Sequence, residues 1–483
     1  MQDSLYWHDY ETFGAVPSVD RPSQFAGLRT DFDLNIIGDP LVIYCQPPLD
    51  ILPSPQACLI TGITPQHAQA HGVPEPEFIA QIHSQLAQPR TCTVGYNSIR
   101  FDDEVTRYAL YRNFYDPYQR EWQNGNSRWD IIDLLRATRA LRPEGIEWPD
   151  HESGSPSFKL EHLTVANGIA HEDAHDALSD VTATIAMAKL VKQAQPKLFD
   201  YVLQNRGKVA VANIVDVHSR KPFFHCSGML PKARLYSAIM MPLAAHPTNK
   251  NAVICFDLSA DPEVLISLDS DDIKQRIFTA AKDLPEGVER IPLKLVHLNK
   301  APMVATPKVV DATVAKRLSI NVERCEQNWQ RLQQIDLQNK LQAVFSESDF
   351  VASDEAEQQL YGGFLPNQDK PLLKQIRAAT AEDFKRQQFY FSDDRYNRLL
   401  LNYRARYYAD SLSANEQSDW LDSCRHRLTD AKIGFRSLEQ QQKDIDQLLG
   451  DAKLSQQDCK ILHALSDWNR EVAVKFSLNT AMK

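Results

Sequence analysis

The stretch LYWHDYETF at positions 5–13 decides the fold of the first part of the chain. Its apolar and β-prone residues predict a strand, and strand side chains alternate faces, so Asp9 and Glu11 point the same way, about 7 Å apart. Two carboxylates on an otherwise apolar face are unfavourable unless something compensates their charge. A divalent metal ion would do so, because hard cations prefer carboxylate oxygen. The alternative is an exposed edge strand with solvated acids.

A second acidic position lies in the segment GYNSIRFDDE at positions 95–104. This segment follows a short β run at 91–96 and opens a predicted helix from about Asp102 to Phe114. Acids at a helix start also interact favourably with the helix macrodipole, which is the preferred explanation for Asp103 and Glu104. The sequence alone does not separate Asp102 from Asp103 as the functional acid.

A third motif, HDALSD at positions 175–180, opens a long helix predicted over 174–192. His175 and Asp180 are five residues apart, so they would not share a face within one helix. If the helix begins near Asp176, His175 lies in the preceding loop and can turn toward the site, while Asp180 faces the sheet. A single histidine is more often structural than catalytic, and Asp176 is interpreted as a helix-start residue.

The composition is that of a soluble globular protein, with 483 residues of which 43% are hydrophobic and 24% charged. No apolar run approaches the length of a membrane helix, and no secretory signal precedes the first strand. None of the eight cysteines forms a Cys-x-x-Cys pair, which predicts a reduced cytoplasmic protein without a zinc site. The net charge of −10 does not favour nucleic-acid binding except through metal ions or local basic surface. Positions 201–250 supply such a surface, with seven Lys or Arg against Asp216 alone.

Three domains are predicted, at 1–195, 196–350 and 353–483. The first mixes helices with strands, and includes a hairpin over 34–45 whose two β runs are split by the turn GDP at 38–40. The second has short β runs, typical of a small barrel or sandwich, at 209–217, 223–229, 237–243, 252–258 and 291–298. Its helical extension begins near position 312, and the third domain is nearly all helix.

The ordered pattern Asp-x-Glu, Asp, His-x₄-Asp resembles the histidine-containing (DEDDh) branch of the DnaQ-like 3′–5′ exonuclease superfamily. Longer phrases resemble the bacterial exodeoxyribonuclease I family, including HDYETFG at 8–14, LITGITP at 59–65, RFDDEVTR at 100–107, YRNFYDPY at 111–118 and LNYRAR at 401–406. The resemblance implies a ribonuclease H-like α/β exonuclease domain with a mixed sheet and flanking helices. An SH3-like β-barrel domain and a C-terminal all-helical domain would follow it.

The resemblance also implies an activity and the residues that perform it. The enzyme would hydrolyse single-stranded DNA processively from the 3′ end to 5′-mononucleotides, in DNA repair and recombination. Two Mg²⁺ ions, for which Mn²⁺ substitutes, would clamp the scissile phosphate. Asp9 would bridge both ions, Glu11 and Asp180 would complete the first site, and Asp102 would hold the second. His175 would accept a proton from the attacking water, since imidazole suits proton transfer near neutral pH.

Contacts with the substrate are predicted more loosely. Tyr118 and Trp122 are candidates for stacking on bases and Arg107 for a phosphate contact, since single-strand channels combine aromatic side chains with cations. Lys159 falls where the family places a basic residue at the substrate, and Glu11 would also touch the DNA. The alternative for several of the aromatic residues and arginines is a place in the core, and for Lys159 it is an ordinary loop lysine.

A protein partner is implied by the resemblance alone. Family members are recruited by the acidic, apolar C-terminal tail of single-stranded DNA-binding protein, and Arg142 and Tyr201 are the matching candidates for that contact. We expect a monomer. The competing functions are a 3′ exonuclease of the same superfamily that acts on RNA or duplex ends, and a non-catalytic nucleic-acid scaffold. The presence of all five active-site residues argues against the scaffold.

Overall fold

The computed structural model describes residues 3–171, 175–346, 353–430 and 434–478. The chain divides into two compact units. Unit 1 comprises Met1–Asn126, Glu172–Thr182 and Val351–Lys483, and unit 2 comprises Ser127–His171 and Ala183–Phe350. The domain limits predicted from the sequence stay predictions.

Strand β1 (Ser4–Thr12) is nearly buried throughout its length and organises the sheet of unit 1. It pairs antiparallel with β2 (Pro22–Thr30) and parallel with β4 (Thr91–Gly95), and β2 pairs antiparallel with β3 (Leu41–Tyr44). The order β3-β2-β1-β4 is therefore mixed, as predicted. Tyr6 and Tyr10 on one face of β1 join a core cluster with Phe78, so the opposite face carries Asp9 and Glu11.

Four helices follow in the N-terminal part of unit 1: α1 (Pro55–Thr61), α2 (Pro65–His71), α3 (Glu75–Leu86) and α4 (Asp102–Arg112). The side chains of Ser54 and Thr64 cap α1 and α2, and a proline occupies the first turn of each. Helix α4 begins at Asp102, as predicted, directly after the 3₁₀ helix η1 (Ser98–Arg100).

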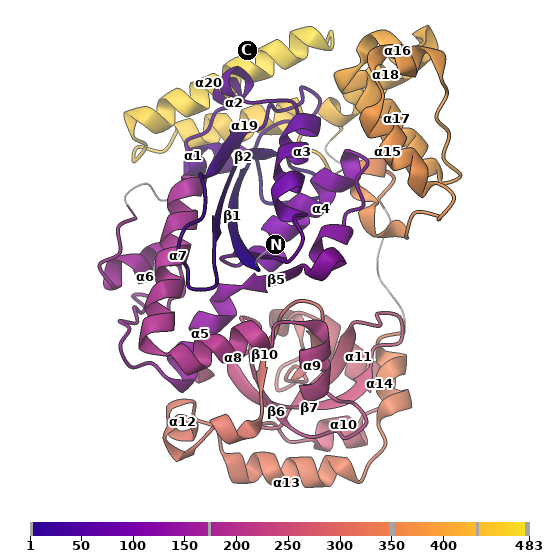
Figure 1. Cartoon of the computed structure of the whole chain (residues 1–483). Helices are drawn as coiled ribbons and strands as arrows, with labels where there is room; N and C mark the ends of the chain where they lie inside the picture. The colour runs from indigo at the N-terminus through magenta and orange to yellow at the C-terminus, as the bar shows by residue number, and fades with distance from the viewer. Residues whose placement is uncertain (1–2, 172–174, 347–352, 431–433, 479–483) are drawn as a thin grey trace. The chain divides into compact units, whose positions relative to one another are not determined.

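The C-terminal residues of unit 1 are helical, as predicted. The helices are α15 (Lys370–Ala378), α16 (Ala381–Arg386), α17 (Asp394–Tyr407), α18 (Ala414–Thr429), α19 (Leu438–Leu449) and α20 (Gln456–Lys475). Helix α20, yellow in Figure 1, packs against α1 and α2. Ile461 and Leu465 of α20 share a core cluster with Phe13 and Cys58, so the two ends of the chain build one interior.

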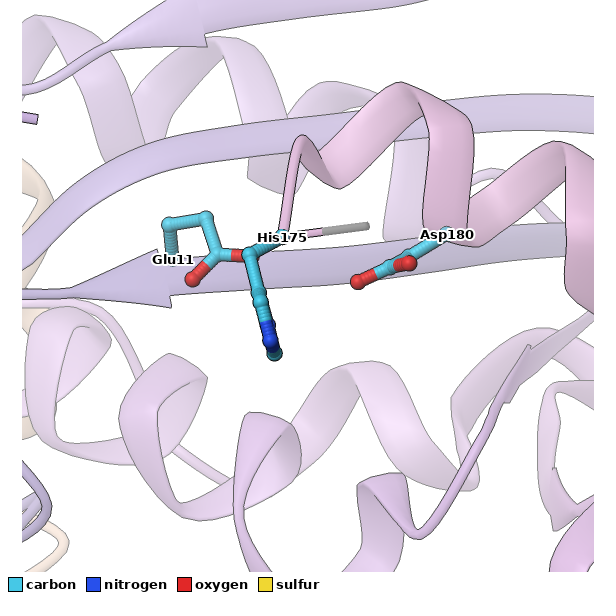
Figure 2. Close-up of side chains that lie close together, drawn as sticks. All are labelled: Glu11, His175 and Asp180. Atoms are coloured by element: carbon cyan, nitrogen blue, oxygen red, sulfur yellow. The ribbon is translucent and has the colours of Figure 1, made fainter. Parts of the chain in front are cut away.

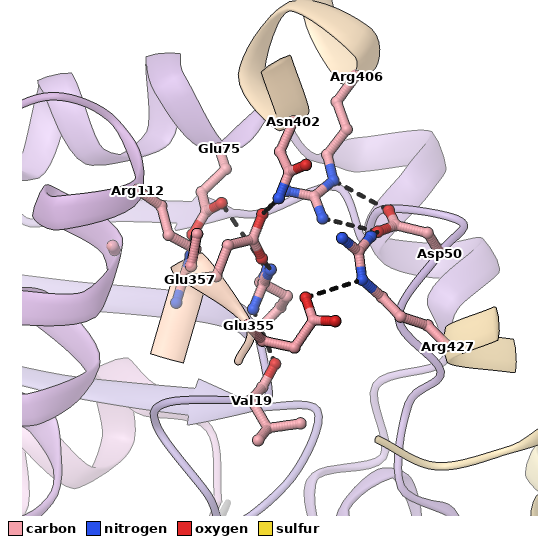
Figure 3. A network of polar contacts seen from close by, with 12 residues as sticks. Val19, Asp50, Glu75, Arg112, Glu355, Glu357, Asn402, Arg406 and Arg427 are labelled. Atoms are coloured by element: carbon pink, nitrogen blue, oxygen red, sulfur yellow. Dashed lines mark hydrogen bonds and ion pairs between the residues drawn. The ribbon is translucent and has the colours of Figure 1, made fainter. Parts of the chain in front are cut away.

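A buried network of charges also joins these two parts of unit 1 (Figure 3). Asp50 accepts hydrogen bonds from Arg406 and Arg427, each with a shortest distance of 2.7 Å. Glu357, in the 3₁₀ helix η7 (Ala356–Gln358), pairs with Arg21 and Arg406. These guanidinium groups hold the pKa of Glu357 well below its usual value and also lower the pKa of Asp50, although burial alone would raise both.

Unit 2 contains a second sheet in the order β10-β6-β7-β8-β9, and its neighbouring strands pair antiparallel. The strands are β6 (Phe223–Cys226), β7 (Ser237–Ala245), β8 (Ala252–Asp257), β9 (Leu293–His297) and β10 (Met303–Ala305). Four of them confirm the β runs predicted from position 223 onward. Phe223, Met240, Cys255 and Val304 meet in the core of this sheet.

The other elements of unit 2 are the short strand β5 (Ser127–Asp130) and a set of helices. Helix α7 (Ala177–Ala194) begins in unit 1 and ends in unit 2. The remaining helices are α5 (Ile131–Leu141), α6 (Leu160–Ala166), α8 (Pro196–Gln204), α9 (Lys208–Ile214), α10 (Glu263–Ser267), α11 (Ser270–Phe278), α12 (Ala312–Arg317), α13 (Val322–Gln333) and α14 (Gln338–Val344). Helices α12 to α14 confirm the helical extension predicted from position 312.

The β run predicted at 209–217 is wrong, because this stretch contains helix α9. Its valines favour a strand by composition, but Val211, Ile214 and Val215 recur at helical spacing. Val211 and Val215 are buried in the core of unit 2 and Ile214 packs against it, while Val209 is 76% exposed. Tertiary packing of this one helical face overrides the local preference for β structure.

The hairpin predicted over 34–45 is also wrong. Residues 34–37 contribute only an isolated bridge between Thr30 and Ile36, and β3 pairs with β2 instead. Asp31 accepts hydrogen bonds from the backbone and side-chain nitrogens of Asn35, at 2.8 and 2.9 Å, and Leu34 has a φ of 68°. This Asp-to-Asn turn bends the chain where the sequence pattern favoured an extended run.

Every cysteine is free, and all but the half-buried Cys459 are buried. Among the residues that the structure describes, no helix is both long enough and apolar enough to cross a membrane.

Candidate active site

Strand β1 carries two of the predicted acids, Asp9 and Glu11. Glu11 is 8% exposed, and its burial together with the carboxylates of Asp180, Asp102 and Asp176 raises its pKa to about 8. Burial likewise raises the pKa of Asp9 well above its usual value, and Asp102 and Glu11 add to the shift by repulsion. These carboxyl groups therefore lie close enough to oppose one another's ionisation.

The start of α7 brings Asp180 close to Glu11, and His175, two positions before the helix, lies beside them. Glu11, His175 and Asp180 each offer one ligand atom, and these atoms all lie within 4.8 Å of one another. Figure 2 shows Glu11 on β1 and the other two side chains at the start of α7. The helix begins at Ala177, so His175 stands just outside it, as predicted, with a φ of 71°.

The structure separates Asp102 from Asp103. The backbone N–H of Tyr10 donates to Asp102 Oδ1 at 3.1 Å, which holds the start of α4 beside β1. Asp103 instead accepts from Arg120 Nη2 at 2.6 Å, in an ion pair whose side chains are 2% and 0% exposed. Asp102 is one of the carboxylates whose repulsion raises the pKa values of both Asp9 and Glu11, so this member of the pair faces the acidic cluster.

The donor set fits a divalent cation. Four carboxylates, from Asp9, Glu11, Asp102 and Asp180, interact with one another within a partly buried space. The raised pKa values of Asp9 and Glu11 mean that the ionised cluster is short of positive charge. Hard divalent ions prefer such oxygen donors, and a histidine nitrogen is an acceptable addition for Mn²⁺ or Zn²⁺. Without a cation, the same cluster would repel a phosphodiester.

The predicted DNA contacts in unit 1 differ in their surroundings. Arg107 is buried, and its guanidinium donates to Glu121 at 2.7 Å and to Glu104 at 2.6 Å. A phosphate contact there stays a prediction that would require these ion pairs to open. Tyr118 is half-buried with the Arg107 guanidinium 5.6 Å from its ring centroid, whereas Trp122 is 66% exposed and accessible for stacking.

The predicted contacts in unit 2 lie on its surface. The Lys159 side chain is 59% exposed and pairs with Glu161 at 3.3 Å. Arg142 is exposed at the end of α5, and Tyr201 on α8 is half-buried with its hydroxyl donating to the carbonyl oxygen of Val304 at 3.2 Å. The roles of these three residues stay predictions.

The basic stretch at 201–250 contains two kinds of residue. Its arginines have structural partners: Arg206 bonds the hydroxyl of Ser127, Arg220 bonds two backbone carbonyl oxygens, and Arg234 pairs with Asp257. Its lysines are exposed, at positions 208, 221, 232 and 250. The surface charge of this stretch therefore comes mainly from lysine.

No sequence motif singled out Gln24, which lies beside the site on β2. Its side chain is hydrogen-bonded to Asp176 and to the backbone of Ala177, although it lies more than 150 positions away in the chain. No strand was predicted at the position of β2, and only the pairing of β1 with β2 places this glutamine opposite Glu11.

A mixed sheet whose first strand carries Asp9 and Glu11, joined by acids from the starts of two helices, is the arrangement that the resemblance to an exonuclease implied. The family model described as "Exonuclease" accordingly matches residues 6–188. The models "Exonuclease I SH3-like domain" and "Exonuclease I C-terminal domain" match residues 206–347 and 354–472. The chain belongs to the exodeoxyribonuclease I family and is an enzyme of that class. The predicted family and the predicted succession of folds are confirmed.

Curated relatives and solved structures agree with this assignment. The chain is 48% identical to exodeoxyribonuclease I of Escherichia coli (strain K12), over 89% of this chain and 90% of the relative. It is 46% identical to exodeoxyribonuclease I of Haemophilus influenzae, over 90% and 92%. The structure of E. coli exonuclease I in complex with a dA16 oligonucleotide matches with a TM-score of 0.93 at 45% identity, covering 98% of this chain and 100% of the other.

Two further solved structures describe ligands and partners of similar proteins. The zinc ion-bound form of an E. coli exonuclease I complex with single-stranded DNA has a TM-score of 0.93 at 45% identity, covering 98% and 100% of the two chains. A structure of SSB/exonuclease I in complex with the inhibitor CFAM has a TM-score of 0.89 at 44% identity, with the same coverage.

Proposed function

We propose that this enzyme degrades single-stranded DNA processively from the 3′ end and releases 5′-mononucleotides. The observation that carries the proposal is the convergence of Glu11, His175 and Asp180, whose ligand atoms lie within 4.8 Å of one another. The similar E. coli enzyme has been crystallised with single-stranded oligonucleotides, which supports this substrate for a relative that matches nearly the whole chain.

Asp9, Glu11, Asp102 and Asp180 would hold two Mg²⁺ ions, for which Mn²⁺ substitutes. When bound, such ions stabilise negative charge on the attacking and leaving oxygens of a phosphodiester. Their binding would also relieve the mutual repulsion that raises the pKa values of Asp9 and Glu11. The zinc-bound form of the similar enzyme supports a divalent cation.

The protein's own groups position and activate the water. His175 would accept the proton that the attacking water loses, because its imidazole lies beside Glu11 and Asp180 on the exposed side of the cluster. Glu11 would also touch the terminal nucleotide. The backbone N–H of Tyr10 would hold the Asp102 carboxylate in place through its hydrogen bond.

Other residues would hold the strand that is being digested. Trp122 and Tyr118 would stack on bases, while Arg107 and Lys159 would contact the backbone phosphates. The exposure of Trp122 supports its part in this, since a base needs an open ring face.

The enzyme would also bind the C-terminal tail of a single-stranded DNA-binding protein. Arg142 would pair with a carboxylate of the tail, and the ring of Tyr201 would contact its apolar residues. Arg142 directly follows α5, and Tyr201 lies on α8. These two helices pack against each other, which supports a shared surface within unit 2. The solved structure of SSB/exonuclease I supports such a partner in the family. We expect the enzyme to act as a monomer.

The test uses a 5′-labelled single-stranded DNA oligonucleotide with Mg²⁺, and parallel reactions with EDTA, a blocked 3′ end, the RNA equivalent and a duplex. Metal-dependent shortening from the 3′ end of single-stranded DNA alone supports the proposal. Asp180→Asn should abolish it, while Asp467→Asn, which replaces an exposed aspartate on α20, should not. Equal digestion of RNA or duplex would instead favour the competing function, a 3′ exonuclease of the same superfamily that acts on RNA or duplex ends. Binding without cleavage would leave a non-catalytic scaffold.

A further inference from the structure

Gln24 uses its whole side-chain amide to connect β2 with the start of α7. Its Nε2 donates to Asp176 Oδ1 at 3.1 Å and to the Tyr44 hydroxyl at 3.2 Å, and its Oε1 accepts from the backbone N–H of Ala177 at 3.2 Å. The residue is 2% exposed. Both amide hydrogens and the carbonyl oxygen are thus used, which fixes the orientation of the amide group.

Asp176 and Ala177, to which Gln24 is hydrogen-bonded, lie between the active-site residues His175 and Asp180 in the sequence. Asp176 directly follows His175, and its Oδ2 accepts from the backbone N–H of Ser179 at 3.1 Å in the first turn of α7. Its carbonyl oxygen accepts from the N–H of Asp180 at 3.0 Å. Asp176 therefore sets both the direction in which His175 leaves the helix and the first turn that presents Asp180.

The other end of this connection is the strand beside Glu11. Gln24 lies directly opposite Glu11 in the antiparallel pairing of β1 with β2, so its backbone is fixed relative to that acid. On its other side it lies opposite Tyr44 of β3, whose hydroxyl holds the amide. The chain of contacts runs from Glu11 through the sheet to Gln24, and from Gln24 to the helix start that carries Asp180.

We propose that Gln24 is a positioning residue that sets His175 and Asp180 at their working distance from Glu11. This inference rests on the proposed function, because it assigns a task in that site to a residue outside the acidic cluster. Gln24 acts through Asp176 and Ala177 and touches no reacting atom. Displacement of catalytic groups by about 1 Å can cost about 10²-fold in rate, so loss of this amide should be visible in turnover.

A residue that merely satisfied buried polar groups would behave differently. Its loss would lower the stability of the fold, but it would leave turnover by the folded enzyme and metal affinity unchanged. The proposal instead predicts a specific loosening of the first turn of α7, since two of the three hydrogen bonds of the amide end there.

The experiment compares Gln24→Met, which keeps the length of the side chain without its hydrogen bonds, with Gln46→Leu. Gln46 is a suitable control because its amide donates to the backbone carbonyl oxygens of Gln69 and Gly72, in and after α2, and not to the start of α7. Gln24→Met should lower kcat on single-stranded DNA about 10²-fold and leave KM within about twofold. Gln46→Leu should change neither value.

Two further readouts do not depend on nuclease activity. Titration with Mn²⁺, followed by electron paramagnetic resonance, should show affinity lowered about tenfold or more in Gln24→Met alone. Hydrogen exchange measured by mass spectrometry should be faster in the peptide that contains Ala177, Ser179 and Asp180. An inactive wild-type enzyme that binds Mn²⁺ would count against the proposed function, while these two readouts would still decide the role of Gln24.

The route through Asp176 is tested by a double-mutant cycle. Asp176→Ala removes the carboxylate that accepts from Gln24, at a residue that is only partly buried. It therefore tests the hydrogen bond between Gln24 and Asp176 even if Gln24→Met fails to fold. Each single variant should lower kcat or Mn²⁺ affinity, and the double variant should lose little more than the worse single variant. Additive losses, or variants that match Gln46→Leu in kcat, Mn²⁺ affinity and hydrogen exchange, would overturn the proposal.

Discussion

Arg120 Nη2 donates to Asp103 Oδ1 at 2.6 Å, and this ion pair directs Asp103 away from the acidic cluster that its neighbour Asp102 faces. The two adjacent aspartates therefore have different tasks. Asp103 compensates a buried guanidinium, while Asp102 stands beside Asp9 and Glu11 and accepts from the backbone N–H of Tyr10.

Exchanging each carboxylate for an amide separates the two tasks. Asp102→Asn should fold normally and lower the cleavage rate at least about 10²-fold, because it removes a charge that holds the metal ions. Asp103→Asn should lower the free energy of unfolding by about 3–5 kcal/mol, because the Arg120 cation stays buried without its counterion. Urea unfolding and single-turnover cleavage measure the two effects. Interchanged results would mean that Asp103 is the metal ligand.

Mg²⁺ should stabilise the enzyme through the same cluster. Burial and repulsion raise the pKa of Glu11 from its usual 4.5 to about 8, so the metal-free folded state holds this proton more tightly than the unfolded state does. The metal-free protein should consequently lose stability as the pH rises through this window. At pH 8, Mg²⁺ at about 100 times its Kd should add about 2.7 kcal/mol to the free energy of unfolding.

Two glutamine variants provide the comparison for this metal effect. Glu11→Gln should remove most of the stabilisation by Mg²⁺, as measured by thermal unfolding with and without the ion. Glu439→Gln should keep it, because Glu439 is an exposed residue of α19 that pairs with Lys443. The same Mg²⁺ shift in both variants would place the ion elsewhere.

How far the sequence predicts this site depends on how local each interaction is. The strand at 5–13 and the helix start at Asp102 follow from short-range patterns, and the structure confirms both. The distinction between Asp102 and Asp103 does not follow, because it depends on Arg120 and on the backbone of Tyr10, which is 92 positions away. Gln24 was missed for the same reason, since its bond to Asp176 spans 152 positions.

The two wrong predictions of the fold have the same physical origin, since distant parts of the chain decide the local structure. Val209, Val211 and Val215 favour β structure by their branching, and only the core that α9 covers shows that helical spacing prevails. The arginines at 206, 220 and 234 contribute to a basic stretch in the sequence, yet each is held by partners that only the folded chain supplies. The number of basic residues in this stretch of sequence therefore overestimates the positively charged surface that is available to DNA.

Acid should unfold the enzyme through the charge network that joins the two parts of unit 1. The pKa of Glu357 lies well below its usual value and that of Asp50 is lowered as well, so both acids stabilise the fold when ionised. This stability is present above their ordinary pKa values and is lost as the pH falls through the lowered values of the folded state. Glu357→Gln should cost about 3–5 kcal/mol at pH 7, because Arg21 and Arg406 lose a buried partner.

The difference in the free energy of unfolding between wild type and Glu357→Gln should shrink on acidification, since the protonated glutamate resembles glutamine. Denaturant unfolding at pH 7 and at pH 3 measures it, and Glu471→Gln on the exposed side of α20 serves as the control. A variant that is as stable as wild type at pH 7 would show that the network contributes no net stability. A pH-independent difference would assign the loss to packing instead of charge.

Trp122 offers the sharpest test of how the enzyme holds its substrate. The side chain is 66% exposed, so Trp122→Ala should leave the melting temperature unchanged. If the indole stacks on a base, the variant should bind a labelled single-stranded oligonucleotide about 1–3 kcal/mol more weakly. Fluorescence anisotropy in EDTA measures this binding without cleavage. Tyr390→Ala, which removes another exposed aromatic residue of unit 1, should bind like wild type. If the two variants bind equally well, the DNA does not pass over Trp122, and the predicted stacking there is wrong.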